Sequence, residues 1–253
     1  MLSKNQIKEI QSLQIKKFRE ARDLFIAEGI KTVSEIMNSQ PALIREIFAT
    51  HDFILNNQAQ LGSLDLRHTE ITESELERIS LQQSPNQVLA VCHYFPERTA
   101  DFDFERNFSL YLDDVRDPGN FGTMIRLADW FGVSTIFCSP GSCDLYNPKV
   151  IQATMGAFLR VHVVYTELDL LKNTQRIPAM YGALLNGKDL YKEALGNGLI
   201  IIGNEANGIR ESNLQLITHP LTIPAHRSNG TESLNAAVAA SIIVSEFFRQ
   251  LRK

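Results

Sequence analysis

The chain has 253 residues, of which 44% are hydrophobic and 21% are charged, so it can bury the core of one large domain or of two small ones. Lys and Arg number 25 against 29 Asp and Glu, and the net charge of −4 excludes a protein that coats nucleic acid through its overall charge. Any nucleic-acid surface must therefore be local.

The first part of the chain, residues 1–95, predicts a small α/β unit in which short helical and apolar segments alternate. A basic helix is expected from about Ser3. After it we expect a strand, a helix and two more strands, at 24–29, 31–39, 43–49 and 88–94. Segment 96–107 is charged, contains Pro96 and has no clean period, so we interpret it as a linker.

The second part, residues 108–253, predicts an α/β fold with a mostly parallel sheet. Its apolar runs are continuous and each is followed by a turn or a helical pattern, which is typical of parallel strands covered on both faces. The expected strands are at 109–114, 134–139, 160–165, 177–185, 199–204 and 220–225. The last helix is expected from about Glu232, and its many small residues permit close packing in the core, at a subunit interface or beside a ligand.

No apolar run reaches the length of a bilayer span, and the polar start of the chain lacks the apolar centre of a secretory signal. The three cysteines, Cys92, Cys138 and Cys143, have neither disulfide-framework nor zinc-ligand spacing. We therefore expect a cytoplasmic protein with reduced thiols, no membrane partner and no metal.

The first of three notable turns lies in "DPGNFGTMIRLADWFG", where a strand passes into a helix. Asn120 can cap this helix. Arg126 lies within two turns of the helix start on an otherwise apolar stretch, where its guanidinium could hold a phosphate or a carboxylate with paired donors. A plain salt bridge is the alternative for Arg126.

The second and third turns also follow expected strands. Glu205 comes directly after "LIIIGN", and a carboxylate at the carboxyl end of a buried parallel strand lies where open α/β sheets place ligand sites, although it could also be a simple helix-start charge. Ser233 and Asn235 stand at the start of the last helix, where capping is their usual role. No Gly-x-Gly-x-x-Gly follows any strand, so a dinucleotide enzyme is disfavoured.

Taken together and in this order, the three turns resemble the SpoU (TrmH) family of RNA ribose 2′-O-methyltransferases, within the knotted SPOUT class. The resemblance rests on "DPGNFGTMIRLADWFG", "LIIIGNEANGI" and "IPAHRSNGTESLNAAVAAS". It implies a catalytic domain with a C-terminal trefoil knot at 108–253. The stretch "KKFREARDLFIAEGIKTVSEIM" looks like the substrate-binding domain often joined to that half, which implies an RNA-binding domain at 1–95.

The resemblance also implies a cofactor, S-adenosyl-L-methionine, and a set of site residues. Backbone groups near Gly203, Ile223 and Leu234 would hold the cofactor. The reacting ribose would be surrounded by Asn120, Arg126, Glu205, Ser233 and Asn235. Arg126 would orient the nucleotide through its phosphate, and either Arg126 or that phosphate would take the proton.

The expected partners are structured RNA, with ribosomal RNA favoured, and a second copy of the chain. The basic start of the chain offers phosphate contacts at Lys16, Lys17, Arg19 and Arg22, although such a helix could simply be a solvated face. The turn at 225–231 is longer than in the family, and its Arg227 could contact RNA or solvent. Transfer RNA as substrate, or a non-catalytic RNA-binding assembly factor that has kept the fold, remain alternatives.

Overall fold

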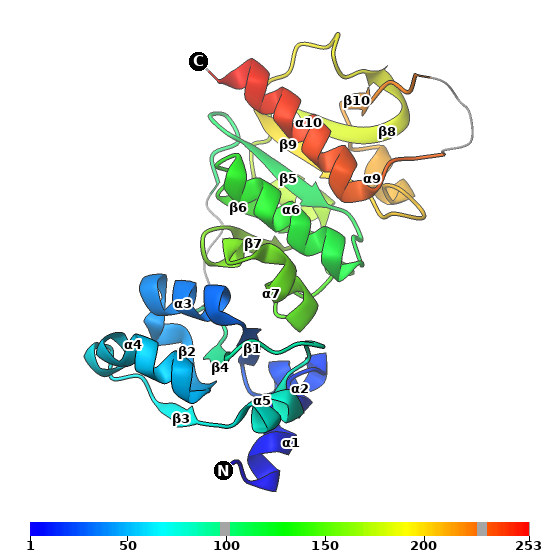
Figure 1. Cartoon of the computed structure of the whole chain (residues 1–253). Helices are drawn as coiled ribbons and strands as arrows, with labels where there is room; N and C mark the ends of the chain where they lie inside the picture. The colour runs from blue at the N-terminus through cyan, green and yellow to red at the C-terminus, as the bar shows by residue number, and fades with distance from the viewer. Residues whose placement is uncertain (97–101, 227–231, 253) are drawn as a thin grey trace. The chain divides into compact units, whose positions relative to one another are not determined.

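The computed structural model describes residues 1–96, 102–226 and 232–252. The chain forms two compact units (Figure 1): Met1–Arg98 together with Asp144–Leu159, and Thr99–Cys143 together with Arg160–Lys253. The sequence prediction placed the whole stretch after 108 in one domain and did not anticipate that 144–159 packs with the N-terminal residues.

The first unit is built around a four-stranded sheet of order β1-β4-β2-β3. Strand β4 is antiparallel to β1 and β2, whereas β2 and β3 are parallel. The predicted strands and helix of this unit are confirmed. Its elements are α1 (Lys4–Ser12), α2 (Lys16–Glu20), β1 (Leu24–Glu28), α3 (Ile30–Ser39), a 3-10 turn (Pro41–Leu43), β2 (Ile44–Ala49), α4 (His51–Ser63), β3 (His68–Glu70), α5 (Glu73–Ile79), β4 (Val88–His93), α7 (Pro148–Thr154) and a second 3-10 turn (Ala157–Leu159).

The predicted single basic helix is in fact two short helices. Ser3 and Gln6 form a capping box at the start of α1, and the helix ends before Leu13. The Arg19 guanidinium donates to the carbonyl oxygens of Leu13 (2.9 Å) and Gln14 (2.8 Å). These carbonyls are thereby satisfied without a continuing helix, which explains the break.

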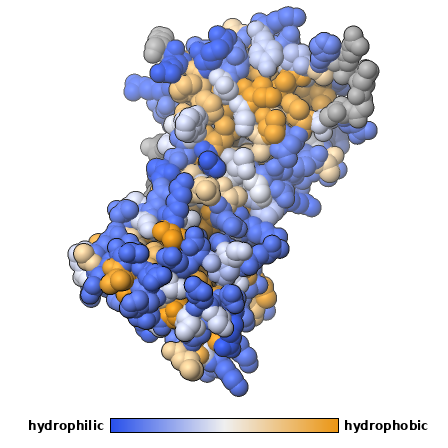
Figure 2. Space-filling view, viewed as in Figure 1, coloured by the Kyte–Doolittle hydropathy of each residue, from blue (hydrophilic) through white to orange (hydrophobic). Residues whose placement is uncertain are grey.

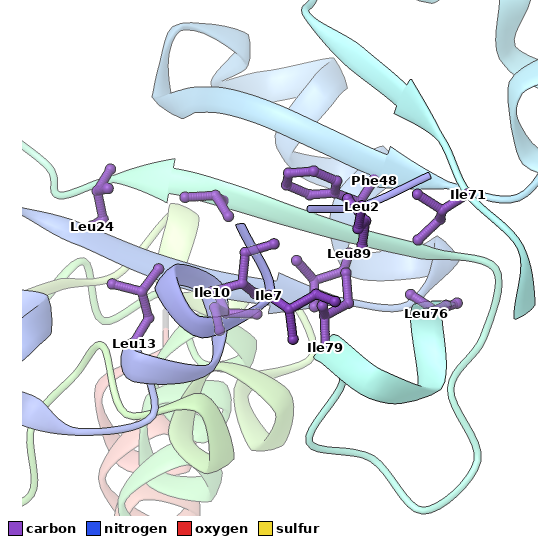
Figure 3. Packing of buried hydrophobic residues seen from close by; sticks show 12 residues of the cluster. Leu2, Ile7, Ile10, Leu13, Leu24, Phe48, Ile71, Leu76, Ile79 and Leu89 are labelled. Atoms are coloured by element: carbon purple, nitrogen blue, oxygen red, sulfur yellow. The ribbon is translucent and has the colours of Figure 1, made fainter. Parts of the chain in front are cut away.

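The core of the first unit is formed by α1, α5 and three of the strands, whose apolar side chains meet (Figure 3). Segment 144–159 adds an aromatic cluster to this unit. The ring of Tyr146 stacks on that of Tyr94 at 3.7 Å between centroids, and Phe158 meets Phe25 edge to face at 6.0 Å. The segment is therefore an integral part of the first unit.

The second unit contains a six-stranded sheet of order β10-β8-β9-β5-β6-β7 in which every neighbouring pair is parallel. All six predicted strands and the mostly parallel sheet are confirmed. The elements are β5 (Phe108–Leu112), α6 (Pro118–Trp130), β6 (Thr135–Cys138), β7 (His162–Tyr165), α8 (Leu168–Thr174), β8 (Met180–Asp189), β9 (Gly198–Ile202), α9 (Glu211–Leu214), β10 (His219–Thr222) and α10 (Ala236–Leu251).

Both faces of this sheet are covered, as the continuous apolar strands predict. On one face α6 and α10 lie side by side (Figure 1), and the ring of Phe247 on α10 contacts that of Phe108 on β5. Tyr111 points to the opposite face because side chains alternate along a strand, and it packs there with Leu168 and Leu171 of α8.

The described part of the predicted linker, 102–107, contributes to this core. Phe102 and Phe104 are buried there, with ring centroids 4.7 Å apart. The alternation of Phe and Asp in the sequence indicates this burial, because it gives the short stretch one apolar face. Within the residues that the structure describes, none of the helices combines the length and apolar character needed to cross a membrane.

Candidate active site

The three notable turns belong to the second unit, and two of them follow neighbouring strands. Leu112 at the end of β5 is in register with Ile202 at the end of β9. Because the two strands are parallel, the segments that follow them emerge at the same edge of the sheet, where open α/β folds place ligands. The start of α10 supplies the third turn.

Helix α6 is capped by Asp117, not by Asn120 as predicted from the sequence. The Asp117 carboxylate accepts a hydrogen bond from the backbone N–H of Asn120 (2.7 Å), and Pro118 occupies the first helical position. This cap leaves the Asn120 side chain available for contacts with other turns.

Side-chain hydrogen bonds join the three turns through Asn120. Its amide nitrogen donates to Glu205 Oε1 (2.8 Å), and its oxygen accepts from Asn235 Nδ2 (2.9 Å). Asn235 Oδ1 in turn accepts from the backbone N–H groups of Ala237 (2.9 Å) and Val238 (3.2 Å), so Asn235 is the predicted cap of α10. Those two donors require an oxygen, and this fixes the orientation of both amides along the chain of bonds.

The loop that carries Glu205 is closed on itself. The backbones of Asn204 and Gly208 exchange two hydrogen bonds, each of 2.9 Å, and Gly208 has φ +67°. A Cβ atom on Gly203 would lie 2.2 Å from the carbonyl carbon of Gly208, so only glycine fits there. Asn204 Nδ2 also donates to the carbonyl oxygen of Asp114 (2.8 Å), which ties the loop to the end of β5.

The sequence analysis did not identify the polar residues that attach this loop to the end of β5. Asp113 is fully buried and accepts hydrogen bonds from the backbone N–H (2.8 Å) and Nε (2.7 Å) of Arg210. Burial alone would lower the pKa of Arg210, but its hydrogen bonds to Glu167 and Asp113 outweigh that effect and raise the pKa. The sequence offers two indications of this ion pair: two adjacent acidic residues directly after β5, and an arginine two positions after Gly208.

Arg126 and Ser233 are exposed, and neither side chain makes a hydrogen bond or ion pair among the residues that the structure describes. The salt-bridge alternative for Arg126 therefore finds no carboxylate in that part of the chain. The five predicted catalytic residues thus divide into two groups. Asn120, Glu205 and Asn235 are bonded to one another, and Arg126 and Ser233 have no side-chain partner within 1–96, 102–226 and 232–252.

The residues expected to hold S-adenosylmethionine fit a ligand with many hydrogen-bonding groups. Gly203, Ile223 and Leu234 lie outside helices and strands, and their backbone N–H and C=O groups have no protein hydrogen-bond partner in the described ranges. Donors and acceptors of this kind suit an adenosine. The predicted long turn at 225–231 lies outside the described residues from Arg227 onward.

The predicted RNA contacts of the first unit need one correction. Lys16, Lys17 and Arg22 are exposed, but Arg19 is buried and forms an ion pair with Asp144. Its guanidinium is used inside the protein, so the prediction that Arg19 contacts RNA is wrong. Among all the residues that the structure describes, in both units, no group of three or more His, Cys, Asp and Glu side chains could hold a metal ion.

Family models match both parts of the chain. The SpoU rRNA Methylase family model matches residues 107–245, and the MRM3-like substrate binding domain matches 4–90. The chain belongs to the SpoU rRNA methylase family. The resemblance inferred from the three turns is therefore confirmed.

Relatives of this SpoU-family chain match along its whole length. The 23S rRNA (guanosine(2553)-2′-O)-methyltransferase RlmP of Bacillus subtilis is 30% identical over 247 residues, which cover 96% of each protein. A TrmH-family structure from Porphyromonas gingivalis is 37% identical, with a TM-score of 0.81 over 99% of each chain. An AdoMet-bound rRNA methyltransferase from Sinorhizobium meliloti is 25% identical, with a TM-score of 0.86 over 100% of this chain and 97% of that one.

Proposed function

We propose that this chain transfers a methyl group from S-adenosylmethionine to a ribose 2′-hydroxyl of ribosomal RNA. The observation that carries the proposal is the chain of hydrogen bonds from Asn235 through Asn120 to Glu205, in a member of the SpoU rRNA methylase family. It brings three turns that are distant in sequence to one place, beside backbone groups that can bind an adenosine.

When bound, S-adenosylmethionine supplies a methyl group on a positively charged sulfur, which needs no further activation. The protein's contribution is to align the 2′ oxygen and to accept its proton, and alignment of two reactants can lower a barrier by about 7–11 kcal/mol. Arg126 has an exposed guanidinium that can bind a phosphate through two parallel hydrogen bonds. Since guanidinium remains charged, we favour the substrate phosphate as the proton acceptor.

The bonded group has a different role from Arg126. Asn120 uses one donor on Glu205 and its oxygen on Asn235, so we assign it to holding the turns together. Ser233 is exposed at the start of the last helix and is the hydroxyl available to the ribose. Gly203, Ile223 and Leu234 would bind the cofactor through their backbones.

The domain organisation follows from the same proposal. Residues 1–95 together with 144–159 would bind the RNA, with Lys16, Lys17 and Arg22 as phosphate contacts. Residues 102–143 together with 160–253 would be catalytic. We also propose the trefoil knot in the C-terminal segment. It is supported by the family membership of the chain and by the packing of α10 against α6, while β10 lies at the edge of the sheet. A cytoplasmic location suits a ribosomal substrate.

A homodimer through the second unit completes the proposal. Apolar side chains gather over α10 in Figure 2, and Val238 on this helix is 48% exposed. Trp130, the only tryptophan of the chain, is 82% exposed on the neighbouring α6. Exposed apolar groups of this kind mark interaction sites. Light scattering should give twice the monomer mass, and Trp130→Ala should shift the protein towards monomer.

The test is methyl transfer from tritiated S-adenosylmethionine to ribosomal RNA purified from cells that lack this protein. The first nucleotide to map is the guanosine of 23S rRNA that corresponds to the one in the name of RlmP. Transfer RNA from the same cells forms the second arm. If only transfer RNA became labelled, transfer RNA would be the substrate in place of ribosomal RNA. If neither RNA became labelled although the protein was folded, catalysis would be refuted.

Arg126→Ala provides the control for catalysis by this site. If the variant retained full methyl transfer, Arg126 would have to be removed from the mechanism.

A further inference from the structure

Asp113 is a carboxylate with no exposed surface and no part in the mechanism described above. It comes directly after β5, and its backbone N–H continues the sheet by donating to the carbonyl oxygen of Ile202 (2.8 Å). Its Oδ2 accepts from the backbone N–H of Arg210 (2.8 Å), and its Oδ1 accepts from Arg210 Nε (2.7 Å). Both carboxylate oxygens are thus directed at one residue.

Arg210 lies at the far end of the loop that carries Glu205. Its Nη2 forms a second ion pair, with Glu167 Oε2 (2.8 Å), just after β7. Asn204 fixes the near end of the loop to the carbonyl oxygen of Asp114 (2.8 Å). The loop is therefore attached at both ends to the residues that follow β5, and Glu205 lies between the two attachments.

The backbone contact distinguishes this arrangement from an ordinary ion pair. A side-chain pair alone would leave the main chain of the loop free to move, whereas the bond from the Arg210 N–H fixes the main chain itself. A buried ion pair is also weak evidence for stability, since the cost of removing two charges from water offsets much of their attraction. Its effect here is to determine where the loop lies.

We propose that Asp113 and Arg210 are positioning residues for methyl transfer, which hold the loop at 203–210 so that Glu205 meets Asn120. This inference rests on the proposed function. The two residues touch neither substrate nor cofactor. Their loss displaces Glu205 from Asn120, and a displacement of about 1 Å at a reacting centre can cost about 100-fold in rate.

The test is a double-mutant cycle on the single-turnover rate of methyl transfer to ribosomal RNA. The variants are Arg210→Lys and Asp113→Asn, each in the natural chain and in a Glu205→Gln background. In the natural chain each should lower the rate about 10- to 100-fold. In the Glu205→Gln background the further loss should shrink to less than about 3-fold, because the residue being positioned has already lost its carboxylate.

A matched control is Arg249→Lys on α10. Arg249 also pairs with a buried carboxylate, that of Glu246 (2.6 Å), but this pair lies within one helix and touches none of the three turns. It should leave the rate within about 2-fold in both backgrounds. Asp113→Asn retains the size of the side chain but replaces one carboxylate oxygen with an amide nitrogen, so one of the two Arg210 donors, the backbone N–H or Nε, then faces another donor. This variant decides the question if Arg210→Lys fails to fold.

A second measurement does not depend on residual activity. Backbone amide exchange in 203–210 should rise about 10-fold or more in Asp113→Asn and remain unchanged in α10, because a local attachment is lost. Equal rate losses in both backgrounds, or unchanged exchange in the loop, would overturn the positioning role. If the natural protein itself transfers no methyl group, the proposed function fails instead, and the two failures are distinguishable.

Discussion

Replacing Asn120 with aspartate tests whether one side chain really holds the three turns together. The change keeps size and shape and keeps an oxygen for Asn235 Nδ2, but it exchanges the donor that now lies 2.8 Å from Glu205 Oε1 for a second negative oxygen. A hydrogen bond to a charged group becomes a contact between two carboxylates.

The expected cost can be worked out from these contacts. A hydrogen bond to a charged partner is worth about 1.5–3 kcal/mol. Two like charges that relax to about 4 Å repel by about 1 kcal/mol in water. Since Glu205 is exposed, we take the lower end of the range for the hydrogen bond and the value in water for the repulsion. We therefore expect Asn120→Asp to reduce the free energy of unfolding of the second unit by about 2–3 kcal/mol at pH 7.

The assay is urea unfolding followed by hydrogen–deuterium exchange of peptides from α6 and β9. This readout reports the second unit even if the two units unfold separately. Asn197→Asp is the matched control, because Asn197 donates a single exposed hydrogen bond to the backbone of Glu105 (2.9 Å). It should cost less than about 1 kcal/mol.

Two further measurements would test whether the contact between the two carboxylates causes the loss of stability in Asn120→Asp. Combining Asn120→Asp with Glu205→Gln returns a donor opposite an acceptor and should recover most of the lost stability. Lowering the pH should also help the single variant, because two adjacent carboxylates raise the pKa of one of them and its protonation restores a donor. The reasoning is refuted if the single variant is as stable as the natural chain, or if the double variant is worse than either single one.

Three further predictions concern other parts of the molecule. Arg126→Ala should change stability by less than about 0.5 kcal/mol, as its side chain has no partner among the described residues, while methyl transfer falls at least 100-fold in a tritium assay. Arg19→Met, which removes the buried partner of the half-buried Asp144 carboxylate, should cost about 3 kcal/mol in urea unfolding. Hydrogen bonds from Arg249 and Gln250 lower the pKa of Glu246 to about 2. Its contribution to the free energy of unfolding is therefore complete above about pH 4.5 and is lost as the pH falls towards 2. Glu246→Gln should reduce the fall in the free energy of unfolding between these two pH values.

The sheet of the second unit was predictable because most of its strands lie in continuous apolar runs that are separated by turns, and such runs can be recognised without knowing their partners. The bonds between the turns were not predictable in the same way. The sequence separates Asn120 from Glu205 and Asn235, and nothing local indicates that Asp117 would take the capping role and leave Asn120 free. Only family resemblance brought these residues together.

The errors in the first unit have a similar origin. A run of basic residues predicts a solvated helix face, but Arg19 is drawn inside by carbonyl groups at a helix end and by Asp144, which is far away in sequence. Periodicity describes which side of an element is apolar. It carries no information on which charge finds a distant partner.

The membership of 144–159 in the first unit has a practical consequence for anyone dissecting this protein. A cut near residue 99 would not release two autonomous pieces, because the C-terminal fragment would carry Tyr146 and Phe158 away from the rings they pack against. Those aromatic surfaces would then face water and favour aggregation. Chimaeras that exchange the N-terminal unit between relatives should therefore transplant 144–159 together with the N-terminal residues.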